Sequence, residues 1–301
     1  LPDAQARPGR VIVAGASGLI GSALVASLRA DGVSVTTLVR RPAGRADEVT
    51  WLDGHPLDPD VLAGADAVVG LNGATIGRFP WTSRYKSELL WSRLMPTRTL
   101  ATALRALGAD APLFVSASAV GYYGTGPGAV AEDAPAGDGF LARLCADWEA
   151  AADAGPNGRV ALLRSAPVVH PDGVLKPMML LTRAGLAGPI GRGTQVWPWI
   201  SLDDEVAAIR RVLDARLTGP VNLVAPTRTT ANDLGFALAV RMNRPYLLRA
   251  PVWGMDLVLG RDATQALLTT DIEVRPAALE ASGFTFTHPR VEDAIAAVIP
   301  A

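Results

Sequence analysis

A glycine-rich turn between an apolar run and a helical pattern constrains the fold of this chain more than any other feature. In VIVAGASGLIG, residues 11–21, three glycines recur at every third position. The first permits a tight turn, the second lets backbone approach a pyrophosphate, and the third lets the helix pack closely on the strand. The start of the helix adds free N–H groups for phosphates. The pattern predicts a dinucleotide site; the alternative is a turn that serves the fold alone. The residues of this site are Gly15, Ala16, Ser17, Gly18, Leu19, Ile20 and Gly21.

Apolar, β-branched runs alternate with helical patterns through the first half of the chain. Strands separated by helical crossovers predict a parallel sheet covered on both faces. With right-handed crossovers this is a doubly wound α/β fold of the Rossmann type. The expected strands are 11–14, 33–39, 49–52, 67–71, 113–116 and 160–163, and the expected helices are 19–30, 84–107 and 140–154.

The alternation ends after about Pro167, where glycine and proline become frequent. The patterns that follow predict a smaller, partly helical lobe on the carboxyl edge of the sheet. Asp203 and Asp204 are expected to cap its second helix and to place negative charge in its first turn. The expected helices are 175–184, 203–215, 230–241, 276–282 and 291–298, with one strand at 221–224. The expected division is a disordered lead-in at 1–10, a nucleotide-binding domain at 11–166 and a substrate-side lobe at 167–301, interwoven with it.

Composition argues against several classes of protein. The net charge is −1, so no basic surface indicates nucleic acid or anionic lipid. No apolar run approaches the ~20 residues that span a bilayer, and the N-terminus lacks the apolar core of a signal peptide. The single cysteine excludes an internal disulfide, and the three histidines have no metal-ligand spacing. We expect a soluble, cytoplasmic, metal-free protein with a small-molecule partner, and the sequence indicates no oligomeric state.

The end of the second expected strand indicates which cofactor binds. Enzymes that favour NAD usually place Asp or Glu there, where it binds the ribose 2′-hydroxyl. This chain has Arg40 and Arg41 instead. Two guanidinium groups suit a 2′-phosphate through charge-assisted, bidentate hydrogen bonds. The pair favours NADP(H); the alternative is a solvated basic pair at a strand end.

Six further motifs carry a family resemblance. They are LNGA at 71–74, RYKSELLWSRLMPT at 84–97, VSASAVGYYG at 115–124, FLARLCADWEAAA at 140–152, DGVLKPMM at 172–179 and WPWISLDDEVAAI at 197–209. With them the chain resembles the atypical branch of the extended short-chain dehydrogenase/reductases. That branch is commonly labelled nucleoside-diphosphate-sugar epimerase-like, and some members carry a cell-division-inhibitor label. Its WPWIS motif more often ends in His, so Ser201 is a departure.

The resemblance implies roles for further residues. Leu71, Asn72 and Gly73 would line the cofactor. Glu88 would reach ribose hydroxyls, and Arg93 a phosphate or the carboxamide. The alternative for these last two is an ordinary surface charge on a long helix.

Ordinary members of the superfamily work with a Tyr acid/base, a Lys four residues later that lowers its pKa, a Ser and an Asn. Ser118 matches the serine. The tyrosine and lysine positions fall on Leu141 and Cys145, and the asparagine position falls on Arg93. Leucine cannot transfer a proton, and a lone buried thiol lacks the charge of the ammonium.

The remaining proton donors are Tyr122 and Tyr123, which follow Ser118 on the same loop. Either hydroxyl would serve an altered catalytic site, or one ring packs in the core while the other covers the cofactor. Two functions remain open. One is an NADP(H)-dependent, epimerase- or dehydratase-like oxidoreductase for an unknown small molecule, and the other is a non-catalytic NADP(H)-dependent sensor or scaffold.

Overall fold

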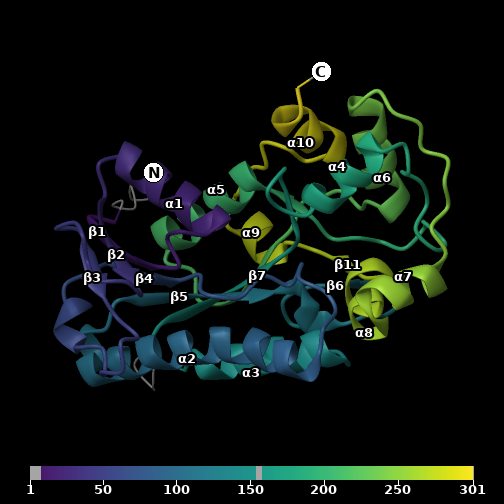
Figure 1. Ribbon diagram of the computed structural model, residues 1–301. Helices are drawn as coiled ribbons and strands as arrows, with labels where there is room; N and C mark the ends of the chain where they lie inside the picture. The colour runs from purple at the N-terminus through teal and green to yellow at the C-terminus, as the bar shows by residue number, and fades with distance from the viewer. Residues whose placement is uncertain (1–7, 154–157, 301) are drawn as a thin grey trace.

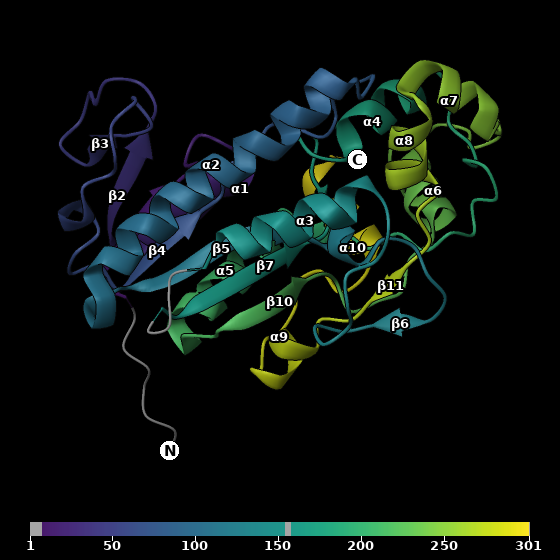
Figure 2. The same ribbon diagram turned by 90° about the horizontal axis from the view of Figure 1, so that it is seen from below.

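The computed structural model describes residues 8–153 and 158–300. Within these residues, seven parallel strands form the central sheet, in the order β10-β7-β5-β4-β1-β2-β3 (Figures 1 and 2). This confirms the doubly wound α/β prediction. The strands are β1 (Arg10–Ala14), β2 (Ser34–Val39), β3 (Glu48–Thr50), β4 (Ala67–Gly70), β5 (Leu113–Ala119), β7 (Val160–Ser165) and β10 (Gly219–Leu223). Residues 1–7 of the expected lead-in lie outside the described residues, and β1 already begins at Arg10.

Two pairs of helices cover the sheet, one pair on each face (Figure 1). One face packs α1 (Leu19–Ala30) and α5 (Leu202–Ala215), and the other packs α2 (Ser83–Leu107) and α3 (Phe140–Ala151). Successive residues of β1 serve the two layers, because strand side chains alternate between faces. Val11 and Val13 join the cluster with Leu24, whereas Ile12 joins the cluster with Phe114. Position 154, the expected end of the third helix, lies outside the described residues.

The order of strands reverses at β1. From there β2 and β3 extend to one side, and β4, β5, β7 and β10 extend to the other. The crevice at the carboxyl ends of β1 and β4 is therefore a topological switch point, where open α/β sheets bind their ligands. The glycine turn follows β1 and the LNGA segment follows β4, so both lie at this crevice.

The expected strand at 221–224 returns to the main sheet. It forms β10, which pairs with β7 in parallel register, with Val221 opposite Leu163. The helix before it, α5, packs beside α1 rather than in the second lobe. Alternating apolar residues predict a strand but not its partner. The long glycine- and proline-rich connection between β7 and β10 gives no sign that the chain returns to the main sheet.

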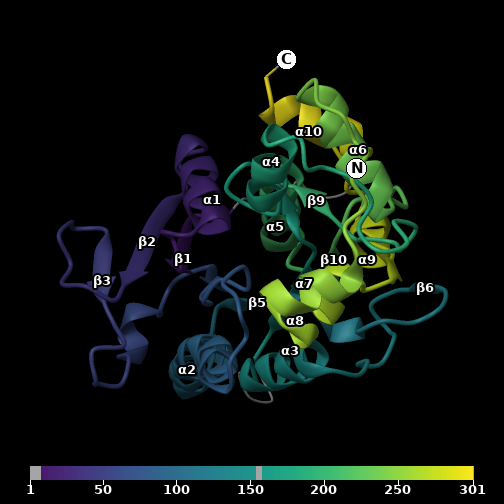
Figure 3. The same ribbon diagram turned by 45° about the vertical axis from the view of Figure 1, so that its right-hand side comes forward.

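The second lobe has its own apolar core, which includes Leu175, Trp199, Leu234 and Ile295. Figure 3 shows α4, α6 and α10 grouped beyond the sheet. None of the helices within the described ranges is both long and apolar enough to cross a membrane. The remaining helices are α4 (Leu175–Arg183), α6 (Ala231–Arg241), α7 (Val252–Leu259), α8 (Arg261–Ala263), α9 (Ala277–Ala281) and α10 (Val291–Val298). Four strands of two residues pair as β6 (Ala129–Val130) with β11 (Glu273–Val274) and β8 (Val168–Val169) with β9 (Ile200–Ser201). Short helical turns lie at η1 (Pro59–Val61), η2 (Gly108–Asp110), η3 (Val120–Tyr123) and η4 (Thr264–Leu268).

The first turn of α5 contains Asp203 and Asp204, as expected, but its cap differs from the prediction. Ser201, not Asp203 or Asp204, is the capping residue, and its hydroxyl accepts from the N–H of Asp204 at 3.1 Å. Asp204 is fully buried and accepts from the N–H groups of Thr287 and His288 instead. Ser201 therefore starts the helix, and Asp204 helps to fix the segment before α10.

Candidate functional site

The glycine turn lies at the carboxyl end of β1, where α1 begins. Gly15 has a left-handed φ of +84°, and a Cβ added there would lie 2.7 Å from the backbone of Leu71. A Cβ on Gly21 would lie 2.2 Å from the carbonyl oxygen of Gly15. The fold itself therefore requires glycine at both positions, because neither contact leaves room for a side chain.

Gly18, the middle glycine, is under no such constraint. Its φ is −77°, which any residue adopts, and an added Cβ would meet only the Gly15 carbonyl oxygen at 3.5 Å, an ordinary contact. Gly18 is also the N-cap of α1, and no side chain of the described residues caps this helix. A helix start with free N–H groups and space in front of it fits a pyrophosphate. Packing within the protein gives no reason for glycine here, whereas a bound phosphate does.

The segment after β4 lies against the glycine turn. Leu71 donates its N–H to the carbonyl oxygen of Ala14 at 2.9 Å, which brings the ends of β4 and β1 together. The Oδ1 atom of Asn72 is buried and has no hydrogen-bond donor among the described residues. A buried oxygen without a donor costs free energy. The end of β4 therefore fits a ligand that donates a hydrogen bond at this point.

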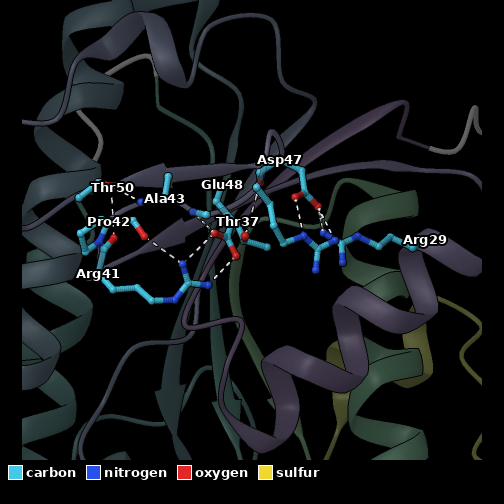
Figure 4. A network of polar contacts seen from close by, with 10 residues as sticks. Arg29, Thr37, Arg41, Pro42, Ala43, Asp47, Glu48 and Thr50 are labelled. Atoms are coloured by element: carbon cyan, nitrogen blue, oxygen red, sulfur yellow. Dashed lines mark hydrogen bonds and ion pairs between the residues drawn. The ribbon is translucent and has the colours of Figure 1, made fainter.

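The two arginines after β2 have different surroundings. Arg41 donates to both carboxylate oxygens of Glu48 on β3, at 2.7 and 2.8 Å (Figure 4). This hydrogen bonding lowers the pKa of Glu48 to about 2, so the carboxylate is ionised at neutral pH. Arg40 is exposed and takes part in no ion pair among the described residues. One of the two guanidinium groups expected at a 2′-phosphate is thus free, and the other already has a carboxylate partner.

Arg93 on α2 is buried, with 9% of its surface exposed. Its Nη1 donates to the carbonyl oxygen of Leu89 at 2.9 Å, and its Nη2 donates to that of Ala74 at 3.1 Å. The guanidinium also stacks on the Trp148 ring, 5.1 Å from the ring centroid. Burial lowers the pKa of Arg93. Glu88, which is expected to reach ribose hydroxyls of the cofactor, is exposed on the same helix.

A buried polar network lies behind the loop that follows β5. Arg164 on β7 donates to Glu149 on α3 through Nε and Nη2, at 2.8 and 2.9 Å. Ser118 donates to the same carboxylate at 2.6 Å. Tyr123 donates to Asn222 on β10 at 2.7 Å and accepts from Arg164 at 2.8 Å. The network ties β5, α3, β7 and β10 together, and it engages the hydroxyl protons of Ser118 and Tyr123.

Tyr122, the other tyrosine of the loop, keeps its hydroxyl out of this network. Its ring covers Arg164, whose Cζ lies 3.6 Å from the ring centroid, and it meets the Tyr123 ring edge to face. Tyr122 is half-buried, whereas Tyr123 is buried. Among the described residues no hydrogen bond reaches the Tyr122 hydroxyl. Of the three residues expected to be catalytic, Tyr122 alone has a hydroxyl free for a ligand.

Comparison with known proteins gives the family. The sequence pattern of the NAD dependent epimerase/dehydratase family matches residues 11–224, more than half of the chain. The chain belongs to this family. A second pattern, a domain of unknown function designated DUF1731, matches residues 250–298.

Relatives in this family match nearly the whole chain. The epimerase family protein Mb2239 of Mycobacterium bovis is 40% identical over 291 residues, which span 95% of this chain and 96% of that protein. A crystal structure of the human epimerase family protein SDR39U1 with NADPH has a TM-score of 0.87 at 31% identity and covers 96% of this chain and 99% of that one. A nucleoside-diphosphate sugar epimerase from Corynebacterium glutamicum has a TM-score of 0.75 at 30% identity, covering 96% of this chain and 57% of that one. These matches confirm the family resemblance drawn from the motifs, although none of these names carries the cell-division-inhibitor label.

The family resemblance predicts that Leu141 and Cys145 replace the usual tyrosine and lysine. Both face Gly121, where an added Cβ would lie 3.3 Å from Leu141 Cβ and 3.8 Å from Cys145 Sγ. Burial raises the pKa of Cys145 to about 12, so the thiol is neutral at physiological pH. Neither side chain exchanges a proton near neutral pH.

Glu149, Arg164 and Asn222 were not among the site residues expected from the sequence. One signal was present in the sequence. Arg164 interrupts an apolar strand, VALLRS, in a sheet expected to be covered on both faces. A charge in such a strand needs a buried acid as its partner, and Glu149 is that acid.

Neither of two prominent hollows in the described residues marks this site. They have volumes of about 320 and 500 Å³, and no predicted cofactor or catalytic residue lines them. No group of three or more His, Cys, Asp or Glu side chains in the described ranges is arranged to hold a metal ion. The candidate site is therefore located by the glycine turn and the switch point rather than by cavity size.

Proposed function

We propose that the chain binds NADP(H) in the crevice between β1 and β4. The glycine turn, residues 15–21, and the start of α1 would hold the pyrophosphate. Leu71, Asn72 and Gly73 would line the cofactor, and Glu88 would reach its ribose hydroxyls. Arg40 would meet the 2′-phosphate, with Arg41 beside it in sequence. The NADPH in the human relative's crystal structure supports this choice.

Gly18 is the observation that carries the proposal, because it leaves space and free N–H groups at the start of α1 although no contact within the described residues requires glycine there. Gly18→Val should abolish NADPH binding in a calorimetric titration while leaving the circular dichroism spectrum unchanged. Gly126→Val is the matched control, since an added Cβ at Gly126 meets nothing within 4 Å. Normal NADPH binding by Gly18→Val would contradict the proposal.

We further propose that the protein is an epimerase- or dehydratase-like oxidoreductase with altered catalytic residues, acting on a small molecule. Bound NADP(H) would supply hydride-transfer chemistry. Tyr122 would exchange a proton with the substrate, because its hydroxyl has no partner within the described chain. Ser118 and Tyr123 would fix the loop that presents Tyr122, through Glu149 and Arg164.

One observation favours a second function, a non-catalytic NADP(H)-dependent sensor or scaffold. The positions aligned with the family's tyrosine and lysine hold Leu141 and Cys145, which cannot exchange protons at neutral pH. A screen that tests carbonyl compounds and nucleotide sugars as substrates, by NADPH oxidation and isotope exchange, distinguishes the enzyme from the sensor. Turnover that Tyr122→Phe removes supports the enzyme, whereas silence from a wild type that binds NADPH supports the sensor.

A further inference from the structure

We infer that Arg93 supplies, from α2, the fixed positive charge at the nicotinamide half of the site, and that it can do so only because position 145 on α3 is uncharged. This inference rests on the proposed NADP(H) site and extends it. It makes Arg93 and Cys145 an interdependent pair. In this pair, a cation on one helix excludes a cation on the other.

Contacts on several sides hold the Arg93 guanidinium in a fixed position. Gly73 lies against one part of it, since an added Cβ there would be 3.1 Å from Arg93 Cζ, and the Trp148 ring stacks on it. The Leu89 and Ala74 carbonyl oxygens hold two of its nitrogens. Few charged side chains are this buried and this closely packed. A single orientation, rather than a mobile surface charge, is the result.

No acid of the described chain balances this charge. Arg93 takes part in none of the ion pairs formed by the described residues, and its named acceptors are neutral oxygens. Buried charges in proteins are normally paired, because an unpaired one loses its hydration without compensation. The missing anion must therefore come from a ligand. Gly73 belongs to the segment that lies against the glycine turn, so the ligand is the one that the turn binds.

Cys145 lies beside this cation. It stands three residues before Trp148 on α3, so the two side chains share one face of the helix. Sγ is buried and lies near Gly121, on the side of the site where Tyr122 follows. A lysine at position 145 would place a second cation near Arg93, and the acid one turn further along α3, Glu149, is already bound by Arg164 and Ser118. Two like charges in a buried site repel strongly. The site can therefore hold either Arg93 or a lysine at position 145 as its buried cation, but not both.

The test measures binding of two ligands and thermal stability in the full chain. NADPH contains both halves of the cofactor, whereas adenosine 2′,5′-bisphosphate lacks the nicotinamide half. Arg93→Met should weaken NADPH binding at least tenfold and leave the affinity for adenosine 2′,5′-bisphosphate within twofold. The melting temperature without ligand should stay unchanged or rise, because an uncompensated buried charge is removed. Arg93→Lys should keep NADPH binding within a few-fold of the wild type.

The interdependence of Arg93 and Cys145 is tested by moving the positive charge from position 93 to position 145. Cys145→Lys alone should lower the melting temperature, whereas Cys145→Lys with Arg93→Met should be tolerated and should regain much of the lost NADPH affinity. A lower melting temperature for Arg93→Met, with equal losses on both ligands, would make Arg93 a structural residue and overturn the inference. Unchanged NADPH binding by Arg93→Met would also overturn it. A wild type that binds neither ligand would instead overturn the proposed function on which the inference depends.

Discussion

Ser118 donates its hydroxyl proton to Glu149 at 2.6 Å, and Arg164 binds both oxygens of that same carboxylate. The serine expected to orient a reacting oxygen is thus anchored in the interior. Its hydroxyl links β5 to α3, and the loop that carries Tyr122 follows β5 directly in the chain. Substitutions in this network should therefore affect stability first.

Breaking the buried pair should destabilise the protein strongly. Arg164→Met leaves the Glu149 charge buried without its partner, so the free energy of unfolding should fall by about 3–5 kcal/mol. Urea denaturation measures this change. The double variant Arg164→Met with Glu149→Met should recover part of the loss, because no charge then remains. Losses that add in the double variant would contradict this account. Arg290→Met, in an exposed ion pair with Asp293, is the control with little expected effect on the free energy of unfolding.

Stability should fall as pH rises, because of Glu205. This carboxyl is fully buried; Ser165 donates to one oxygen at 2.6 Å, and the other has no partner in the described residues. Burial raises its pKa from 4.5 to about 8. Between these values the folded state keeps a proton that the unfolded state has lost. Its contribution is therefore complete below pH 4.5 and disappears as pH rises to about 8, with a slope of up to about 1.4 kcal/mol per pH unit.

Glu205→Gln should flatten this pH dependence and make the protein more stable than the wild type at pH 8. Urea denaturation at pH 5, 6.5 and 8 measures both effects. Glu280→Gln, which changes an exposed glutamate, should keep the wild-type dependence. An unaltered slope in Glu205→Gln would show that another group is responsible.

Cofactor preference should depend on Arg40. NADPH should bind at least tenfold more tightly than NADH, and Arg40→Asp should narrow or invert this ratio in calorimetric titrations. Glu48→Gln should strengthen NADPH binding a few-fold, because Arg41 loses its competing carboxylate. Arg45→Asp, at an exposed arginine paired with Asp47, is the control and should leave the ratio of NADPH to NADH affinity unchanged. Equal wild-type affinities for NADPH and NADH would rule out the preference.

The two neighbouring tyrosines should respond oppositely to loss of the hydroxyl. Tyr123→Phe removes a group that bonds Asn222 and Arg164, so the free energy of unfolding should drop by about 1–3 kcal/mol. Tyr122→Phe should leave stability within about 0.5 kcal/mol. If the protein is catalytic, Tyr122→Phe should lower turnover by roughly 10²-fold or more with little change in NADPH affinity. A loss of turnover confined to Tyr123→Phe would transfer the role to that residue.

The sequence was sufficient where a local rule determines the structure. Period-3.6 patterning placed α1 at its observed bounds, and the glycine spacing located the turn that the fold requires at Gly15 and Gly21. Local rules could not identify Glu149 and Arg164 as partners, since the contact depends on how α3 lies across β7. The burial of Arg93 was equally inaccessible, because Gly73 and Trp148 approach it from distant parts of the chain.

The return of the chain to form β10 limits how this protein can be divided. A fragment ending at residue 166 would leave one edge of β7 unpaired, and an exposed strand edge invites aggregation. The same fragment would also lack α5, which covers part of the face that α1 shares. A truncation designed to isolate the nucleotide-binding unit should therefore end after Leu223. Such a fragment must carry the glycine- and proline-rich excursion between β7 and α5 as an insertion, not as a removable module.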